Sequence, residues 1–133
     1  MAVEDKKVIK KLLAVVALAS VSFFAKSAIT DRPLTQQEIS LVEAEVKASL
    51  KDPGSAKFKH VNLIQDSESS IDVYCGQVNA KNSYGGYVGF KPFMVILLTN
   101  QKNERKAMTL PEGEESSTIK EKATMKQCAN HGY

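Results

Sequence analysis

The chain has 133 residues, a length that corresponds to one small domain, and its formal net charge is +3. Five of the 18 basic residues and two of the 15 acidic residues lie in the first 27 positions, which leaves 13 of each kind in the remainder. A neutral remainder argues against nucleic-acid binding, because that function needs a clustered positive surface to neutralise phosphates.

Residues 1–27 have the composition of a secretory signal peptide. Lysines cluster at positions 6–11, an apolar run covers 12–25, and the small residues Ala25 and Ser27 suit cleavage by a signal peptidase. The apolar run has about 14 residues, whereas a membrane-spanning helix needs roughly 20, so an uncleaved anchor is the less favoured alternative. We therefore expect a periplasmic or secreted protein that keeps no stable membrane span after signal cleavage.

The chain contains two cysteines, Cys75 and Cys128. In an exported protein, where thiols are oxidised, such a pair is expected to form a disulfide. Closing so long a loop would stabilise the fold by roughly 4 kcal/mol. The alternative is a metal site, but His60 and His131 do not give the ligand spacing of a zinc site. We therefore expect neither a metal nor a cofactor.

An amphipathic helix is predicted from Thr35 onward. Thr35 and Glu38 fit a capping box, in which each side chain accepts a hydrogen bond from the backbone N–H of the other residue. The helix is expected to end at 52–54, because Pro53 disfavours helical geometry in the residue before it. Glu43 and Lys47 are expected to pair on its exposed side. Spacings of three and four residues predict one buried stripe, formed by Ile39, Val42, Val46 and Leu50.

Beyond this helix the hydrophobic period changes to that of strands. The strand at 90–99 is apolar on both faces and is expected to be central in the sheet. Ser117 or Thr118 is expected to cap a short C-terminal helix that carries Cys128. Residues 28–133 are thus predicted to form a single small α+β domain: an N-terminal amphipathic helix packed on a three- to four-stranded antiparallel sheet, a short C-terminal helix and one disulfide. The predicted strands are 61–65, 71–79, 90–99 and 106–110.

Two segments of the chain resemble a family of small exported bacterial proteins. The first is DPGSAKF at 52–58, and the second is CGQVNAKNSYGGYVGF at 75–90. They fit the family pattern DPxSAKF followed by CGxVNAKNSYGGYxGF, and the resemblance extends over roughly 50–93. It implies a secreted or envelope location and a second cysteine near the C-terminus, as at Cys128, but no particular activity.

The sequence matches no catalytic arrangement that we recognise, so we expect a protein that is not an enzyme. A Gly-x-Ser-x-Gly elbow is absent, and Gly85-Gly86 lacks the Lys-Ser/Thr pair and the following helix of a phosphate-binding loop. His60 is interpreted as a partly buried structural residue. The carboxylates of Asp66, Glu68, Asp72, Glu112, Glu114 and Glu115 and the basic pairs Lys57/Lys59 and Arg105/Lys106 are interpreted as solvated charges.

The candidate site is the polar segment between the second and third predicted strands. In a purely structural interpretation, Gly85, Gly86 and Gly89 supply the backbone freedom of a wide connection with a bulged return strand. In a functional one, the segment is a recognition surface, because tyrosine gives contact area at low entropy cost. The connection is also longer than the two to five residues that a hairpin needs. The candidate recognition residues are Asn79, Lys81, Asn82, Ser83, Tyr84 and Tyr87.

Two classes of function are compatible with these features. The first is an exported, non-catalytic envelope protein that binds another envelope or secreted protein, as an accessory component of a secretion or conjugation system, an inhibitor or an immunity protein. The second is a periplasmic domain that binds a small molecule or a glycan, with its tyrosines as stacking platforms. We favour the first class, because so small a domain has little room for a deep cleft.

Overall fold

The computed structural model describes residues 28–110 and 116–133. The predicted signal peptide at 1–27 and the glutamates Glu112, Glu114 and Glu115 lie outside the described residues. Within the described residues the structure confirms an α+β protein with antiparallel sheets, two α-helices and one disulfide. Its elements are β1 (Ile29–Arg32), α2 (Gln36–Lys47), the short 3-10 helix η1 (Pro53–Ser55), β2 (Lys57–Lys59), β3 (Leu63–Asp66), β4 (Ile71–Asn79), β5 (Lys91–Thr99), β6 (Arg105–Met108) and α3 (Ser117–Asn130).

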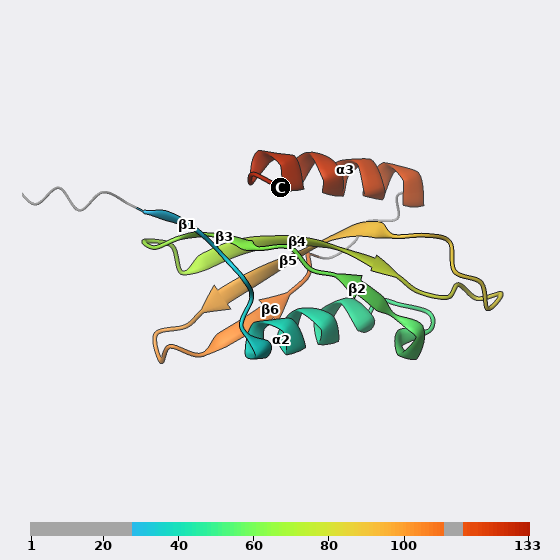
Figure 1. Cartoon of the computed structure of the whole chain (residues 1–133), viewed down its shortest axis with the longest axis horizontal. Coiled ribbons are helices and arrows are strands. Elements are labelled where there is room, and N and C mark those ends of the chain that lie inside the picture. Colours follow the sequence, from blue (N-terminus) through green and yellow to red (C-terminus); the bar gives the residue numbers. More distant parts are fainter. Residues whose placement is uncertain (1–27, 111–115) are drawn as a thin grey trace, which may run out of the picture.

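A four-stranded antiparallel sheet with the order β2-β4-β5-β6 forms the middle layer. α2 lies against β5 and β6 on one face, and α3 lies against β4 and β5 on the other (Figure 1). β5 is central, as predicted, because it pairs with both β4 and β6. The main hydrophobic core is formed by Leu34, Val42, Val46, Leu63, Tyr74, Val78, Phe93, Val95 and Leu97.

α2 begins at the predicted capping box but ends earlier than predicted. The Glu38 N–H donates to Thr35 Oγ1 at 3.2 Å, and the Thr35 N–H donates to Glu38 Oε2 at 2.9 Å. At the other end, the backbone N–H and the hydroxyl of Ser49 both donate to the Val46 carbonyl, at 3.1 and 2.8 Å. A serine side chain bound to the backbone in this way favours a turn over a longer helix. Leu50 therefore lies beyond the helix, although it still packs against the core.

The sheet differs from the predicted meander in two respects. β1 precedes α2, so the amphipathic helix is not the N-terminal element, and β1 pairs with β3 in a separate two-stranded sheet. The predicted strand 61–65, which corresponds to β3, is therefore not a member of the four-stranded sheet. β2 takes that place, with 57–59 paired to 77–79 of β4.

Two tyrosine hydroxyl groups link the segment 61–66 to β4 where no backbone pairing is present. The Tyr133 hydroxyl accepts a hydrogen bond from the Ile64 N–H at 3.1 Å and donates to the Val73 carbonyl at 3.0 Å, so it bridges the two strands. The Tyr74 hydroxyl accepts from the Val61 N–H at 3.2 Å. Because buried backbone groups must find partners, these side chains satisfy groups that a continuous ladder would otherwise pair.

Four charged side chains form a network of ion pairs between α2 and the sheet. Arg32 donates to both carboxylate oxygens of Glu38, at 2.8 and 2.9 Å, and Arg105 donates to Glu38 at 3.2 Å. Arg105 also donates to Asp72 at 2.6 Å. The interpretation of Asp72 and Arg105 as solvated charges is therefore wrong: Asp72 is only 3% exposed, because strand alternation places it on the same face of β4 as Tyr74. The hydrogen bonds from Arg32 lower the pKa of Glu38 to about 2, although burial opposes this shift.

Candidate functional site

The connection between β4 and β5 is an ordered hairpin that covers residues 80–90. Its tip is closed by Asn82, whose N–H donates to the Gly86 carbonyl at 2.9 Å and whose carbonyl accepts from the Gly85 N–H at 3.0 Å. The Asn82 side-chain oxygen also accepts from the N–H groups of Tyr84, at 2.9 Å, and Gly86, at 3.2 Å. Gly85 has a φ of +80°, which glycine adopts without strain. Gly89 likewise has a positive φ, +99°, whereas Gly86 does not.

Ser55 connects this hairpin to the segment after α2. Its hydroxyl oxygen accepts a hydrogen bond from the Lys81 N–H at 2.8 Å, and its carbonyl accepts one from the Tyr87 hydroxyl at 2.8 Å. The hydroxyl of Ser55 in turn donates to the Asp52 carbonyl at 2.8 Å. The two segments at 52–58 and 75–90 therefore meet in space and form one unit. The sequence signal that could have pointed to this contact is the predicted family pattern, which both segments fit.

Aromatic rings and lysines share the surface of this unit. Tyr84 is 97% exposed at the tip, and Tyr87 and Phe90 are 40% and 36% exposed. The Lys57 ammonium lies 4.7 Å from the centroid of the Tyr87 ring, and the Lys59 ammonium lies 4.1 Å from that of Phe90. Sequence reasoning did not include Lys57, Lys59 or Phe90 in the candidate site. We call the set of Lys57, Lys59, Lys81, Tyr84, Tyr87 and Phe90 the hairpin surface.

The six predicted recognition residues have different positions in the structure. Lys81, Tyr84 and Tyr87 belong to the hairpin surface, whereas Asn82 holds the turn together through its side chain. Ser83 is exposed. The side-chain oxygen of Asn79 is buried at the end of β4, and among residues 28–110 and 116–133 it has no hydrogen-bond partner. The structure thus brings three of the six together as an accessible surface.

Gly76 allows the strands beneath this surface to pack closely. A Cβ atom at this position would lie 2.7 Å from a ring carbon of Phe93 and 3.2 Å from the Lys59 carbonyl oxygen. Such distances are shorter than van der Waals contact, so a larger residue would displace the Phe93 ring or β2. The glycine that follows the cysteine in the second segment therefore has a packing role.

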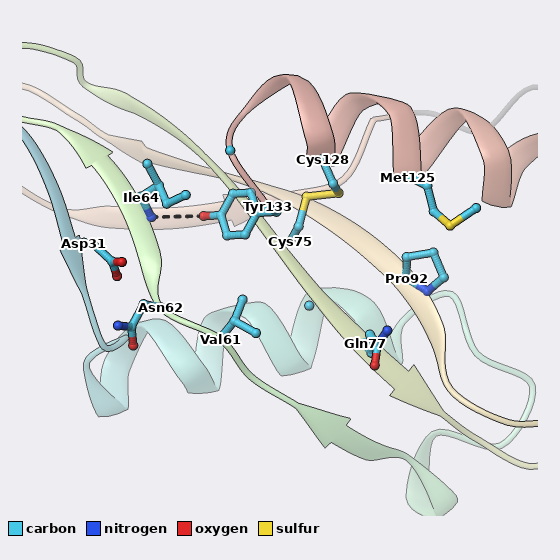
Figure 2. Close-up of a pocket in the computed structure, with 12 residues that line it drawn as sticks. Asp31, Val61, Asn62, Ile64, Cys75, Gln77, Pro92, Met125, Cys128 and Tyr133 are labelled. Carbon is cyan, nitrogen blue, oxygen red and sulfur yellow. Dashed lines mark hydrogen bonds between the residues drawn. A yellow bond between two sulfur atoms is a disulfide. The ribbon is translucent and has the colours of Figure 1, made fainter.

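A hollow of about 630 Å³ lies between α3 and the sheet. Figure 2 shows that Tyr133 and the Cys75–Cys128 disulfide hold the C-terminal end of α3, while Met125 on the same helix faces Pro92 of β5. Cys128 is the one buried residue among those described in α3, so this helix contributes little to the hydrophobic core. The hollow is lined by Asp31, Val61, Asn62, Ile64, Cys75, Gly76, Gln77, Pro92, Met125, Cys128, Gly132 and Tyr133.

The cysteines and His60, which the sequence analysis considered as reactive or metal-binding groups, make structural contacts. Cys75 is oxidised in the disulfide with Cys128, as predicted. His60 is partly buried, as predicted: its Nδ1 lies 2.9 Å from the Tyr74 hydroxyl and its Nε2 lies 3.1 Å from Glu43 Oε1. Burial raises the pKa of the Tyr74 hydroxyl. Within 28–110 and 116–133, no group of three or more His, Cys, Asp or Glu residues has an arrangement that could hold a metal ion.

Comparison of the chain with protein-family models, curated proteins and solved structures gives no match. Membership of the family with the pattern DPxSAKF and CGxVNAKNSYGGYxGF therefore stays a prediction. Among the helices that the structure describes, none is long and apolar enough to cross a membrane.

Proposed function

We propose that the protein is exported, is not an enzyme, and binds another envelope or secreted protein through the hairpin surface. The observation that carries this proposal is an ordered turn that presents exposed rings: Asn82 and Ser55 fix the backbone, yet Tyr84 is 97% exposed. A preorganised loop loses little entropy on binding, and tyrosine provides a large contact area with few rotatable bonds. In such a role the protein is an accessory component of a secretion or conjugation system, an inhibitor or an immunity protein.

Two features support export. The Cys75–Cys128 disulfide suits an oxidising compartment, because cytoplasmic thiols are normally kept reduced. Residues 1–27 have the order of regions of a signal peptide. Cell fractionation with intact-mass measurement tests this part of the proposal. We expect the protein outside the cytoplasm with 1–27 removed, and full-length protein in the cytoplasm would contradict it.

Site-specific photo-crosslinking in the bacterium that produces the protein tests the binding surface. A photoreactive amino acid in place of Tyr84 is expected to give one discrete adduct with another protein. The control position is Lys102, which is also exposed but lies in the turn between β5 and β6, at the far end of the sheet. Both positions tolerate the substitution because their side chains are solvated. Equal adducts from both positions, or none from position 84, would contradict the proposal.

The hollow beneath α3 supports a second candidate function, the binding of a small apolar molecule. Its volume of about 630 Å³ lies within the range of ligand sites, and Val61, Ile64, Pro92 and Met125 provide apolar lining. A ligand there would raise the melting temperature of the wild-type protein. The Met125→Trp variant would fill the hollow and abolish that shift, and a shift retained in this variant would exclude the hollow as the site.

A further inference from the structure

Acidic residues are scarce in the two segments that build the hairpin surface. Asp52 is the one acidic residue in 52–65, and no Asp or Glu occurs in 73–103. Three lysines of these segments, Lys57, Lys59 and Lys81, lie on the hairpin surface. The two segments are neighbours in space, because β2 pairs with the end of β4 from which the hairpin extends (Figure 1). A chain that is neutral after residue 27 therefore carries a local concentration of positive charge at one end of its sheet.

The structure holds these lysines in defined positions. The ammonium groups of Lys57 and Lys81 lie 4.7 and 5.8 Å from the centroid of the Tyr87 ring, and that of Lys59 lies 4.1 Å from the centroid of Phe90. Cation–π contacts of this kind restrict the side chains. Less rotamer entropy is then lost when the ammonium groups bind a partner.

Lys57, Lys59 and Lys81 differ from two other lysines in their ion pairing. Lys47 pairs with Glu43 at 3.2 Å, and Lys91 lies 3.8 Å from Glu121. By contrast, none of the ammonium groups of Lys57, Lys59 and Lys81 is paired with a carboxylate of the described residues. Their charges are therefore available for a carboxylate from another molecule.

We infer that the hairpin surface binds an acidic, extended segment of the partner protein, an inference that rests on the proposed function. Lys57 and Lys59 are two residues apart on one face of β2, so their Cα atoms are separated by roughly 6.6 Å, the repeat of alternate residues in a strand. Carboxylates at alternate positions of an extended segment have the same repeat. β2 is an edge strand of its sheet, which leaves such a segment free to approach along it. The rings of Tyr87 and Phe90 add apolar contact area beside the charges.

The tip of the hairpin favours a protein partner over a lipid surface. Segments that enter the membrane interface present large apolar residues such as Trp, Phe and Leu at their leading end. Here the tip has the order Lys81-Asn82-Ser83-Tyr84, and the Asn82 side chain is used to close the turn. Phe90 lies further back, next to β5.

Nuclear magnetic resonance titration of the mature protein tests the inference. The probes are a short soluble peptide of alternating Glu and Thr, the same peptide with Gln in place of Glu, and vesicles of phosphatidylglycerol. We expect the Glu peptide to shift the amide signals of 57–59 and 80–90, and raising the salt concentration from about 20 to about 200 mM to weaken this binding. The Gln peptide is expected to leave these signals unchanged. Shifts spread over all exposed lysines, or binding of the vesicles alone, would overturn the inference.

A matched pair of triple variants separates local recognition from net charge. The variant Lys57→Gln/Lys59→Gln/Lys81→Gln is expected to bind the Glu peptide about tenfold more weakly, whereas Lys102→Gln/Lys106→Gln/Lys122→Gln should change the affinity by less than about threefold. Dispersed amide spectra confirm that both variants fold. Equal weakening in the two variants would overturn the inference. If the photoreactive residue at position 84 gives an adduct but the Glu peptide does not bind, the inference of an acidic partner segment is overturned and the proposed function stays intact.

Discussion

Protonation of Glu38 is expected to account for a large part of the acid sensitivity of this fold. Glu38 is 4% exposed, and the hydrogen bonds from Arg32 lower its pKa from 4.5 to about 2. A folded-state pKa below the unfolded value contributes stability that is fully present above pH 4.5 and is lost as the pH falls towards 2. At about 1.4 kcal/mol per pKa unit, the shift corresponds to about 3 kcal/mol, a substantial share of the 5–15 kcal/mol typical of small domains.

The Glu38→Gln variant measures this contribution. Urea unfolding followed by circular dichroism should show the variant about 3 kcal/mol less stable than the wild type at pH 7. The difference should shrink below pH 4.5 and nearly vanish at pH 2, because the wild-type carboxylate is by then half protonated or more. Glu68→Gln, at an exposed carboxylate in the turn between β3 and β4, is the control and should follow the wild type. A stability difference between Glu38→Gln and the wild type that stays constant from pH 7 to pH 2 would refute the reasoning.

Two further substitutions test the packing and hydrogen bonds beneath the hairpin surface. Gly76→Ala is expected to lower the free energy of unfolding by about 1–3 kcal/mol, because the new methyl group overlaps the Phe93 ring. Gly54→Ala is the control, because its Cβ would lie 3.8 Å from the side-chain oxygen of Asp52, an ordinary contact; it should change the free energy of unfolding by less than about 0.5 kcal/mol in the same urea titration. Ser55→Ala leaves the Lys81 N–H without its acceptor, so we expect a loss of about 1 kcal/mol and faster amide hydrogen exchange at that N–H. Unchanged exchange there would show that Ser55 does not hold the hairpin.

The start of α2, the two long strands and the disulfide could be predicted from the sequence. Thr35 and Glu38 gave the start of α2, because a capping box is a local signal that needs no knowledge of the rest of the fold. β4 has the predicted bounds, and β5 begins one residue after the predicted start. The pairing of Cys75 with Cys128 followed from having two cysteines in a chain that is predicted to be exported.

The short strands and the ion-pair network could not be predicted in this way. β1 and β2 have only four and three residues, which is too short for an alternating pattern to stand out from the surrounding sequence. Asp72 and Arg105 are distant in sequence from each other and from Arg32 and Glu38, so the sequence does not show that the four charges meet. Ser55 was missed for the same reason, since its contacts with Lys81 and Tyr87 are both long-range.

The contact of Ser55 with the hairpin has a consequence for attempts to transplant or imitate this surface. A linear peptide copied from 79–91 would lack the Ser55 anchor for Tyr87 and the two lysines of β2. Antibodies raised against such a peptide should therefore recognise the denatured chain better than the folded protein. A shortened polypeptide that reproduces the hairpin surface has to contain both 52–60 and 75–93, joined so that their two strands can pair.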